Sequence, residues 1–140
     1  MQMEYGKVGE TNLPPRKGNA SLAESADMAR LAALTADDRK AREIRILDIR
    51  SISAVADYFV ICTGTSNTHI RAIADHVEGK LSSQGIDLHH MEGYRNGRWI
   101  LLDYGSVVVH VMHEEERSFY NLERLWGDAR IVQMPTSEAG

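Results

Sequence analysis

The stretch that decides the fold is residues 57–81, DYFVICTGTSNTHIRAIADHVEGKL. Its first part, Tyr58 to Thr63, is mostly β-branched and aromatic, which is typical of a buried strand. After the tight turn Gly64-Thr65-Ser66, apolar residues recur at helical spacing: Ile70, Ile73, Ala74, Val77 and Leu81. This spacing predicts an amphipathic helix that ends at Gly85. A strand joined to a helix in this way indicates an α/β unit.

Strand and helix patterns alternate on both sides of this unit. Ser21 and Glu24 have capping-box spacing, which predicts a helix that ends or resets near Thr35. Glu114–Glu116 open a last helix, where acids complement the helix dipole, and Gly127 caps its end. The stripe expected to be buried in that helix is Phe119, Leu122, Leu125 and Trp126. Further strands are expected over residues 44–49, 87–92, 99–103 and 107–113.

These elements predict an α/β fold, with a mixed sheet of about five strands and helices on one or both faces. The chain has 140 residues, which is the size of one domain. Residues 1–20 contain Gly and Pro with little apolar content and are predicted to be a disordered lead. The domain is expected over residues 21–134, and residues 135–140 are expected to be a flexible tail.

The composition and charge of the chain argue against several classes of protein. The net charge of −4 and the pI of about 5.8 argue against a protein bound mainly to nucleic-acid phosphate, but not against one with a protein partner. Cys62 is the one cysteine, so no internal disulfide or multi-cysteine zinc site is expected. No apolar run is long enough to span a membrane and no signal peptide is recognisable, so the expected location is the cytoplasm.

Residues 99–113 form the most informative pattern, two strands joined by a tight turn. With Tyr104 and Gly105 as the turn residues, side chains alternate so that one face is wholly apolar. That face consists of Ile100, Leu102, Val107, Val109 and Val111. The opposite, mixed face consists of Trp99, Leu101, Asp103, Ser106, Val108, His110 and Met112. The mixed face fits two interpretations, a second buried layer under a helix or a protein-binding surface, where aromatic residues and Met are enriched.

Residues that could carry catalysis are few. Gly64-Thr65-Ser66 either holds a phosphate at the helix start or simply caps the helix, and it lacks the Lys of a P-loop. A nucleotidyltransferase needs paired carboxylates for its metals, and the strand near Asp87 offers one. Cys62 and His69 suggest a nucleophile pair, yet Cys62 lies inside a strand and is expected to pack as a small apolar group. Asp57 is expected to pin the start of that strand. No enzymatic activity is therefore expected.

Two further groups of residues are candidate sites. Adjacent histidines in a strand point to opposite faces, and an odd spacing separates the other candidate pair. No metal site or cofactor is therefore expected at His89, His90, His110 or His113. The less apolar side of the last helix is either a solvated surface or the rim of an interface, and it carries Arg117, Tyr120 and Arg124.

Several ordered motifs at matching spacing resemble one known family. They are residues 57–66, 73–77, 92–93, 99–105, 107–112 and 117–126. Together these motifs are similar to the ribosomal silencing factor family, also called Iojap-like, over residues 22–132. The resemblance implies a fold related to nucleotidyltransferases but without their catalytic carboxylates, which agrees with the single carboxylate at Asp87.

The resemblance also implies a function. A member would bind ribosomal protein fourteen of the large subunit, obstruct joining of the small subunit and lower translation in stationary phase or starvation. The implied mechanism is steric occlusion without chemistry or cofactor, with rRNA contacted only peripherally and a homodimer often formed. Two alternatives stay open. One is an assembly factor of the large subunit that uses the same contact or binds RNA, and the other is an enzyme of the nucleotidyltransferase type.

The site that the resemblance implies can be placed by position. The partner-binding residues would be Trp99, Leu101, Asp103, Val108, His110, Met112, Arg117 and Tyr120. The strand members of this set lie on the mixed face of the hairpin. The family usually has Gly-Asp before the valine run, whereas this chain has Gly105-Ser106, so one carboxylate is missing. The acidic balance fits docking on a basic ribosomal protein, because complementary charge speeds encounter.

Overall fold

The framework of the protein is a mixed sheet covered by helices on both faces. The computed structural model describes residues 20–127 and 129–132. Within this part of the chain the sheet has six strands in the order β3-β4-β5-β2-β1-β6. The strands are β1 (Arg42–Asp48), β2 (Tyr58–Gly64), β3 (His90–Glu92), β4 (Trp99–Asp103), β5 (Val107–His113) and β6 (Arg130–Val132). The helices are α2 (Ala20–Asp38), α3 (Asn67–Ser83), α4 (Glu114–Tyr120) and α5 (Leu122–Leu125).

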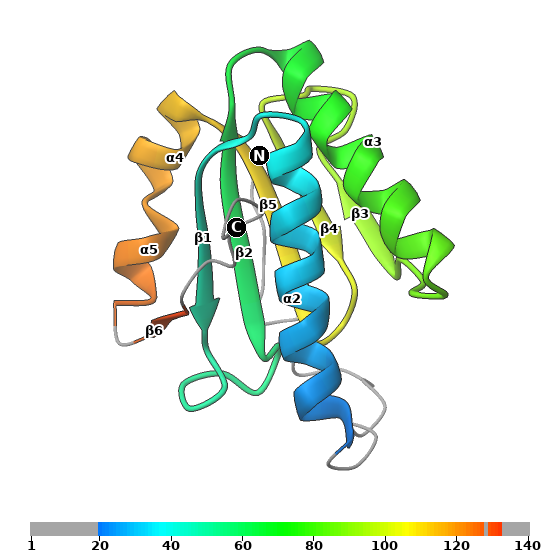
Figure 1. Ribbon diagram of the computed structural model, residues 1–140. Coiled ribbons are helices and arrows are strands. Elements are labelled where there is room, and N and C mark those ends of the chain that lie inside the picture. The colour runs from blue at the N-terminus through cyan, green and yellow to red at the C-terminus, as the bar shows by residue number, and fades with distance from the viewer. Residues whose placement is uncertain (1–19, 128, 133–140) are drawn as a thin grey trace, which may run out of the picture.

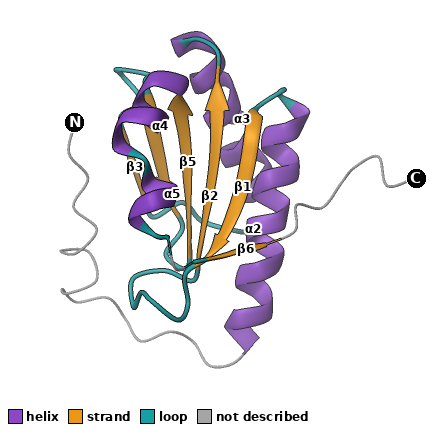
Figure 2. Ribbon diagram, turned by 90° about the vertical axis from the view of Figure 1, so that its left-hand side faces the viewer, coloured by secondary structure: helices purple, strands orange, loops and turns teal. Residues whose placement is uncertain are grey.

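Three layers result from this order (Figure 1). The helices α2 and α3 cover one face of the sheet, and α4 and α5 lie on the other, as the turned view in Figure 2 shows. β2 and β5 run parallel at the centre, and the remaining pairs are antiparallel. None of the helices in the described residues is long and apolar enough to cross a membrane.

The strand-turn-helix unit forms as its sequence predicts. Every residue of β2 is buried, and the predicted stripe of α3 is buried against the sheet. Ser66 caps α3, because its side chain accepts a hydrogen bond from the His69 backbone N–H at 3.0 Å. A Cβ at Gly64 would lie 2.6 Å from Ile70 Cγ1, so this glycine lets the helix pack closely on the strand. The turn therefore has the capping role that was one of its two interpretations.

The hairpin turn was misplaced by the sequence prediction. The turn residues are Gly105 and Ser106, because Asp103 pairs with Val108 and the Tyr104 N–H donates to the Val107 carbonyl. Gly105 has φ +88°, and Asp103 Oδ1 accepts its N–H at 2.7 Å, which stabilises the bend there. The register differs from the predicted one by two residues. An even shift leaves every side chain on its predicted face.

Three element boundaries also differ from expectation. α2 continues to Asp38 without a reset, because the Thr35 hydroxyl donates to the Leu31 carbonyl inside the helix at 2.7 Å. The strand expected over residues 87–92 is reduced to β3 at its end. β6 was not predicted, since three residues are too few to show a period. The predicted lead and tail, residues 1–20 and 135–140, lie outside the described residues except for Ala20.

Candidate functional site

The mixed face of the hairpin is covered by the α4–α5 segment. Its apolar cluster consists of Leu47, Ile49, Ala56, Phe59, Ile61, Trp99, Leu101, Val108, Met112 and Leu122. Five predicted partner-binding residues are at most 4% exposed, namely Trp99, Leu101, Val108, His110 and Met112. These side chains therefore form no open surface, and their part in binding a partner stays a prediction. The alternative, a second buried layer under a helix, is what the chain forms, because Leu122 and Trp126 pack onto the sheet.

His110 and Trp99 form a buried polar pair within this layer. The Trp99 Nε1–H donates to His110 Nδ1 at 3.1 Å, so the neutral imidazole carries its proton on Nε2. Phe59 meets the His110 ring edge-on, with ring centroids 4.9 Å apart. Burial lowers the pKa of His110 to about 3. His110 therefore stays uncharged at neutral pH and orients the indole of Trp99.

Tyr120 connects this buried layer with the surface of the protein. Its ring lies 5.0 Å from that of Trp99 and 4.9 Å from that of Phe119. Tyr120 is 40% exposed, Phe119 81% and Leu125 70%. The prediction that Phe119 and Leu125 belong to a buried stripe is wrong. The cause is Asn121, which takes φ 47° and divides the predicted helix into α4 and α5, so one helical period does not run through both.

The outer side of α4 and α5 is consequently an apolar surface that lies over buried aromatic side chains. We call Phe119, Tyr120 and Leu125 the outer patch. α5 ends at Leu125, and its C-cap is Trp126 instead of the predicted Gly127. Trp126 is partly buried and stacks edge-on against Phe59 at 5.4 Å. Contacts of α5 with the sheet therefore hold the outer patch in place.

Arg117 holds α4 against the end of β2. Its guanidinium donates to Thr63 Oγ1 at 2.9 Å and binds both carboxylate oxygens of Glu123 at 3.0 and 3.1 Å. These hydrogen bonds lower the pKa of Glu123. The Arg117 side chain is 11% exposed. Arg117 is therefore a tether between three elements, neither a solvated residue nor an open interface rim as the sequence had indicated.

The hairpin turn is fastened to the start of β2 by backbone contacts. The Ser106 carbonyl accepts hydrogen bonds from the N–H groups of Asp57 and Tyr58 at 2.7 and 3.1 Å. The buried Asp57 carboxylate accepts the Ser25 hydroxyl of α2 at 2.9 Å, which confirms that it pins the start of the strand. Since the Ser106 contacts use its carbonyl, they do not need the carboxylate that this position lacks.

The candidate catalytic residues do not come together. Asp87 is exposed and lies in the loop before β3. Cys62 is buried within β2, and burial raises the pKa of its thiol to about 12, which suppresses the thiolate. His69 Nδ1 accepts the Thr65 N–H at 2.9 Å, and its Nε2 contacts the Arg39 carbonyl at 2.7 Å. His69 therefore fastens the turn before α3 to the chain after α2.

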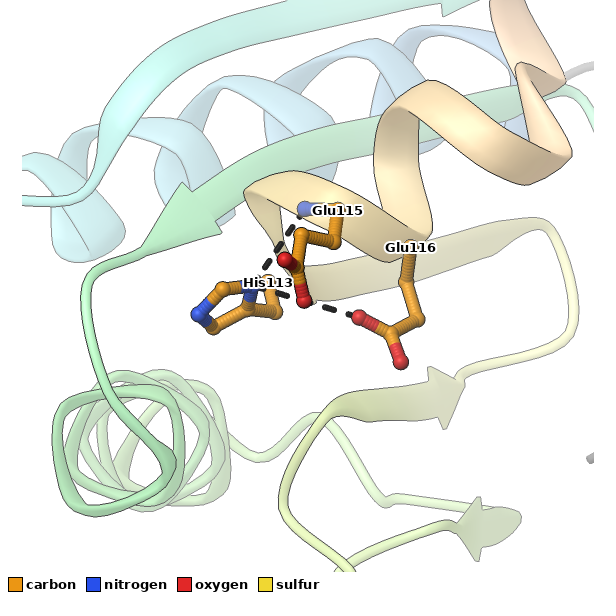
Figure 3. Close-up of side chains that lie close together, drawn as sticks. All are labelled: His113, Glu115 and Glu116. Carbon is orange, nitrogen blue, oxygen red and sulfur yellow. Dashed lines mark hydrogen bonds and ion pairs between the residues drawn. The ribbon is translucent and has the colours of Figure 1, made fainter.

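A cluster that the sequence did not reveal lies at the start of α4 (Figure 3). Oxygen and nitrogen atoms of His113, Glu115 and Glu116 lie within 4.8 Å of one another. Arg98 balances the two carboxylates, at 2.7 Å from Glu115 and 2.6 Å from Glu116. His113 Nδ1 accepts the Glu115 N–H and caps the helix. The cluster thus anchors α4 to the segment before β4. Sequence spacing alone could not show it, because Arg98 precedes the helix by a whole hairpin.

One known protein family matches most of the chain. Residues 22–139 match the family described as ribosomal silencing factor during starvation. The chain belongs to this family. A ribosomal silencing factor of Bacillus subtilis is 48% identical over 105 residues, covering 75% of this chain and 89% of its own length. The chloroplastic Iojap protein of Zea mays is 34% identical over 113 residues, which cover 81% of this chain and 49% of its length.

Solved structures of similar proteins share the fold of this silencing factor. A crystal structure from Chromobacterium violaceum has a TM-score of 0.72 at 35% identity and covers 82% of this chain and 92% of its own. One from Bacillus halodurans has a TM-score of 0.67 at 40% identity, with coverages of 82% and 99%. The predicted family and α/β architecture are thereby confirmed. Membership associates the chain with ribosomes and translational regulation.

Proposed function

We propose that this silencing factor docks on ribosomal protein fourteen of the large subunit and blocks joining of the small subunit. Translation would then fall in stationary phase or starvation, and the protein would act in the cytoplasm. The observation that carries the proposal is the family match over residues 22–139. A steric mechanism is supported by the buried position of Cys62, since burial raises the pKa of its thiol to about 12 and so suppresses the nucleophilic thiolate.

The docking surface that the geometry favours is the α4–α5 side of the molecule. The outer patch offers exposed aromatic and aliphatic groups, which are enriched at the centres of protein interfaces. Trp99 and His110 support Tyr120 from beneath, together with the buried Leu101, Val108 and Met112. Arg117 positions α4, and the half-buried Asp103 lies at the far end of the same sheet face. Most of the predicted site residues would thus support the contact surface from beneath.

Sedimentation of separated ribosomal subunits tests the proposal. With saturating protein, we expect the subunits to remain apart under conditions in which they otherwise join. Normal joining at saturation would refute silencing by occlusion. If the protein still binds large subunits while joining is normal, a role in late assembly of the large subunit replaces it, because that role uses the same contact.

A pair of variants tests the docking surface itself. Phe119→Ala combined with Tyr120→Ala should weaken binding to large subunits by more than about 1 kcal/mol, as loss of central aromatic contacts does. Ile52→Ala is the matched control, since Ile52 is 38% exposed in the loop between β1 and β2. Circular dichroism should show the same fold for both. Equal affinity of the double variant and the control would remove the outer patch from the contact.

A further inference from the structure

A short basic segment stands out in this acidic chain. Residues 39–45 contain Arg39, Lys40, Arg42 and Arg45, four of the sixteen basic residues, and one acid, Glu43. All four basic residues are exposed. Their side chains form no hydrogen bond or ion pair with any other described residue, although Arg45 is close enough to Glu123 to help lower its pKa. Four exposed basic residues, with no side-chain hydrogen bond or ion pair to another described residue, thus lie close together in a protein whose net charge is −4.

An irregularity in β1 directs two of these cations to one face. Arg42 pairs with Thr63 and Arg45 pairs with Ile61, so three steps along β1 match two steps along β2. In a regular strand, residues three apart point to opposite faces. The extra residue instead places Arg42 and Arg45 on the face of their partners, where Thr63 contacts Arg117 of α4 and Ile61 joins the apolar cluster.

This irregularity strains the backbone at an exposed place. Glu43, inside the bulge, has φ 47°, a left-handed value that residues other than glycine adopt at a cost. Lys40 also has a positive φ, of 63°, but it lies in the turn that ends α2, where the N–H groups of Lys40 and Ala41 donate to the carbonyls of Asp37 and Ala36. The Glu43 side chain is exposed, so core packing does not require the strain there. Strained positions of this kind concentrate at functional sites, and bulges often re-aim a side chain there.

The surroundings leave the basic edge open. β6 pairs with β1 only at Ile46, Leu47 and Asp48, so the half of β1 that carries both arginines has no outer strand among the described residues. Figure 1 shows this half of β1 at the end of the strand away from β6. Of the acids near this edge, Glu123 binds Arg117, and Asp38 lies 3.6 Å from His76. Glu43 and Asp37 are further exposed acids that neighbour the four basic residues in the sequence.

We infer that Arg42 and Arg45, flanked by Arg39 and Lys40, form an edge that binds the phosphate backbone of ribosomal RNA beside the docking surface. Guanidinium groups bind phosphate through paired hydrogen bonds, and two on one strand face present charges about 7 Å apart. The segment lacks an exposed apolar side chain that could select a peptide, since Ile44 packs against the core. The inference rests on the proposed docking to the large subunit and adds a second contact to it.

Salt dependence of binding tests this edge. The probes are deproteinised large-subunit rRNA and purified large subunits, each titrated between about 50 and 200 mM monovalent salt. Arg42→Gln combined with Arg45→Gln should make the slope of log affinity against log salt shallower by about 1.4–1.8, because two phosphate contacts are lost. Arg42→Lys combined with Arg45→Lys should keep most of the slope. Lys80→Gln with Arg95→Gln, which removes two exposed charges elsewhere, should match the wild type.

The outcomes separate this inference from the proposed function. A wild-type slope on both probes in the Gln double variant would overturn the basic edge. Weaker binding to large subunits with unchanged binding to naked rRNA would also overturn it, because the edge would then recognise an acidic protein segment. Failure of the wild-type protein to bind large subunits would count against docking. Binding of naked rRNA that is salt-dependent and lost in the Gln variant would still support the edge.

Discussion

His110 is the residue whose protonation is most costly to the fold. Burial lowers its pKa to about 3 in the folded state, whereas an exposed imidazole titrates near 6.5. Between these values the unfolded chain binds a proton that the folded chain does not, so the free energy of unfolding falls as the pH falls. His110→Gln, which retains an acceptor for Trp99, should reduce this dependence by up to about 1.4 kcal/mol per pH unit in that window. Urea unfolding at a series of pH values measures it.

An exposed histidine provides the control for this measurement. The His90 side chain is 57% exposed, and its ring contacts Glu92 at 2.8 Å. His90→Gln removes an imidazole from the surface and leaves the buried layer intact, so it tests whether the change in His110→Gln depends on burial. The same reduction in both variants would show that the dependence does not come from the buried imidazole.

The sheet faces on which these residues lie could be predicted from the sequence, but the segment that covers each face could not. Alternation along a strand assigns Trp99 and His110 to one face, and the misplaced turn left this intact because the register moved by two residues. Whether a face meets solvent depends on what folds back over it. The contact of Arg117 with Thr63, 54 residues away, is of that kind, since no local period encodes it.

The α4–α5 segment is attached to the sheet by few buried side chains. Neither helix is long and within them only Leu122 is buried, so polar contacts carry much of the attachment, namely those of Arg117 and those of Arg98 at the start of α4. Arg117→Lys cannot reproduce the paired bonds to Glu123 together with the bond to Thr63. We expect a local loss of about 1–3 kcal/mol, measured as faster hydrogen exchange of amides in α4 and α5.

Two comparisons make this prediction specific. Amides of β2 should keep their protection in Arg117→Lys, since the sheet does not depend on the tether. Arg124→Lys should leave α4 and α5 unchanged, because Arg124 is exposed and its side chain forms no hydrogen bond or ion pair within the described part of the chain. Equal exchange rates in Arg117→Lys and the wild type would assign the attachment to the Arg98 contacts and the buried side chains instead.

At the element scale, long periodic segments were predictable and short ones were not. α3 carries a full apolar stripe and a Ser cap, so its start and buried face follow from the sequence. The α4–α5 break depends on one left-handed residue, Asn121, whose side chain caps the next helix by accepting the Arg124 N–H at 3.2 Å. An Asn inside an apparent stripe is the signal that could have indicated the break, because Asn tolerates this conformation.

At the scale of the whole molecule, the order of the strands could not be predicted from the sequence pattern. The parallel contact of β2 with β5 joins segments separated by α3 and the β3–β4 region, and β1 lies on the other side of β2. Such non-local pairings leave no trace in local periodicity. They nevertheless decide which segments meet at the surface, because Arg45 of β1 comes close enough to Glu123 of α5 to help lower its pKa. β1 and α5 therefore come together only in the folded chain.

The proposed occlusion of subunit joining would act by occupancy, so its effect should follow stoichiometry. In a titration of subunit joining, inhibition should saturate at about one molecule per large subunit, and dilution of the protein should restore joining. The double variant at Phe119 and Tyr120 should need a higher concentration for the same effect, because it weakens the contact and not a chemical step. An enzyme would behave differently, since a few molecules would act on many subunits and the inhibition would persist after the protein is removed. Inhibition at a small fraction of equivalence would therefore contradict occlusion.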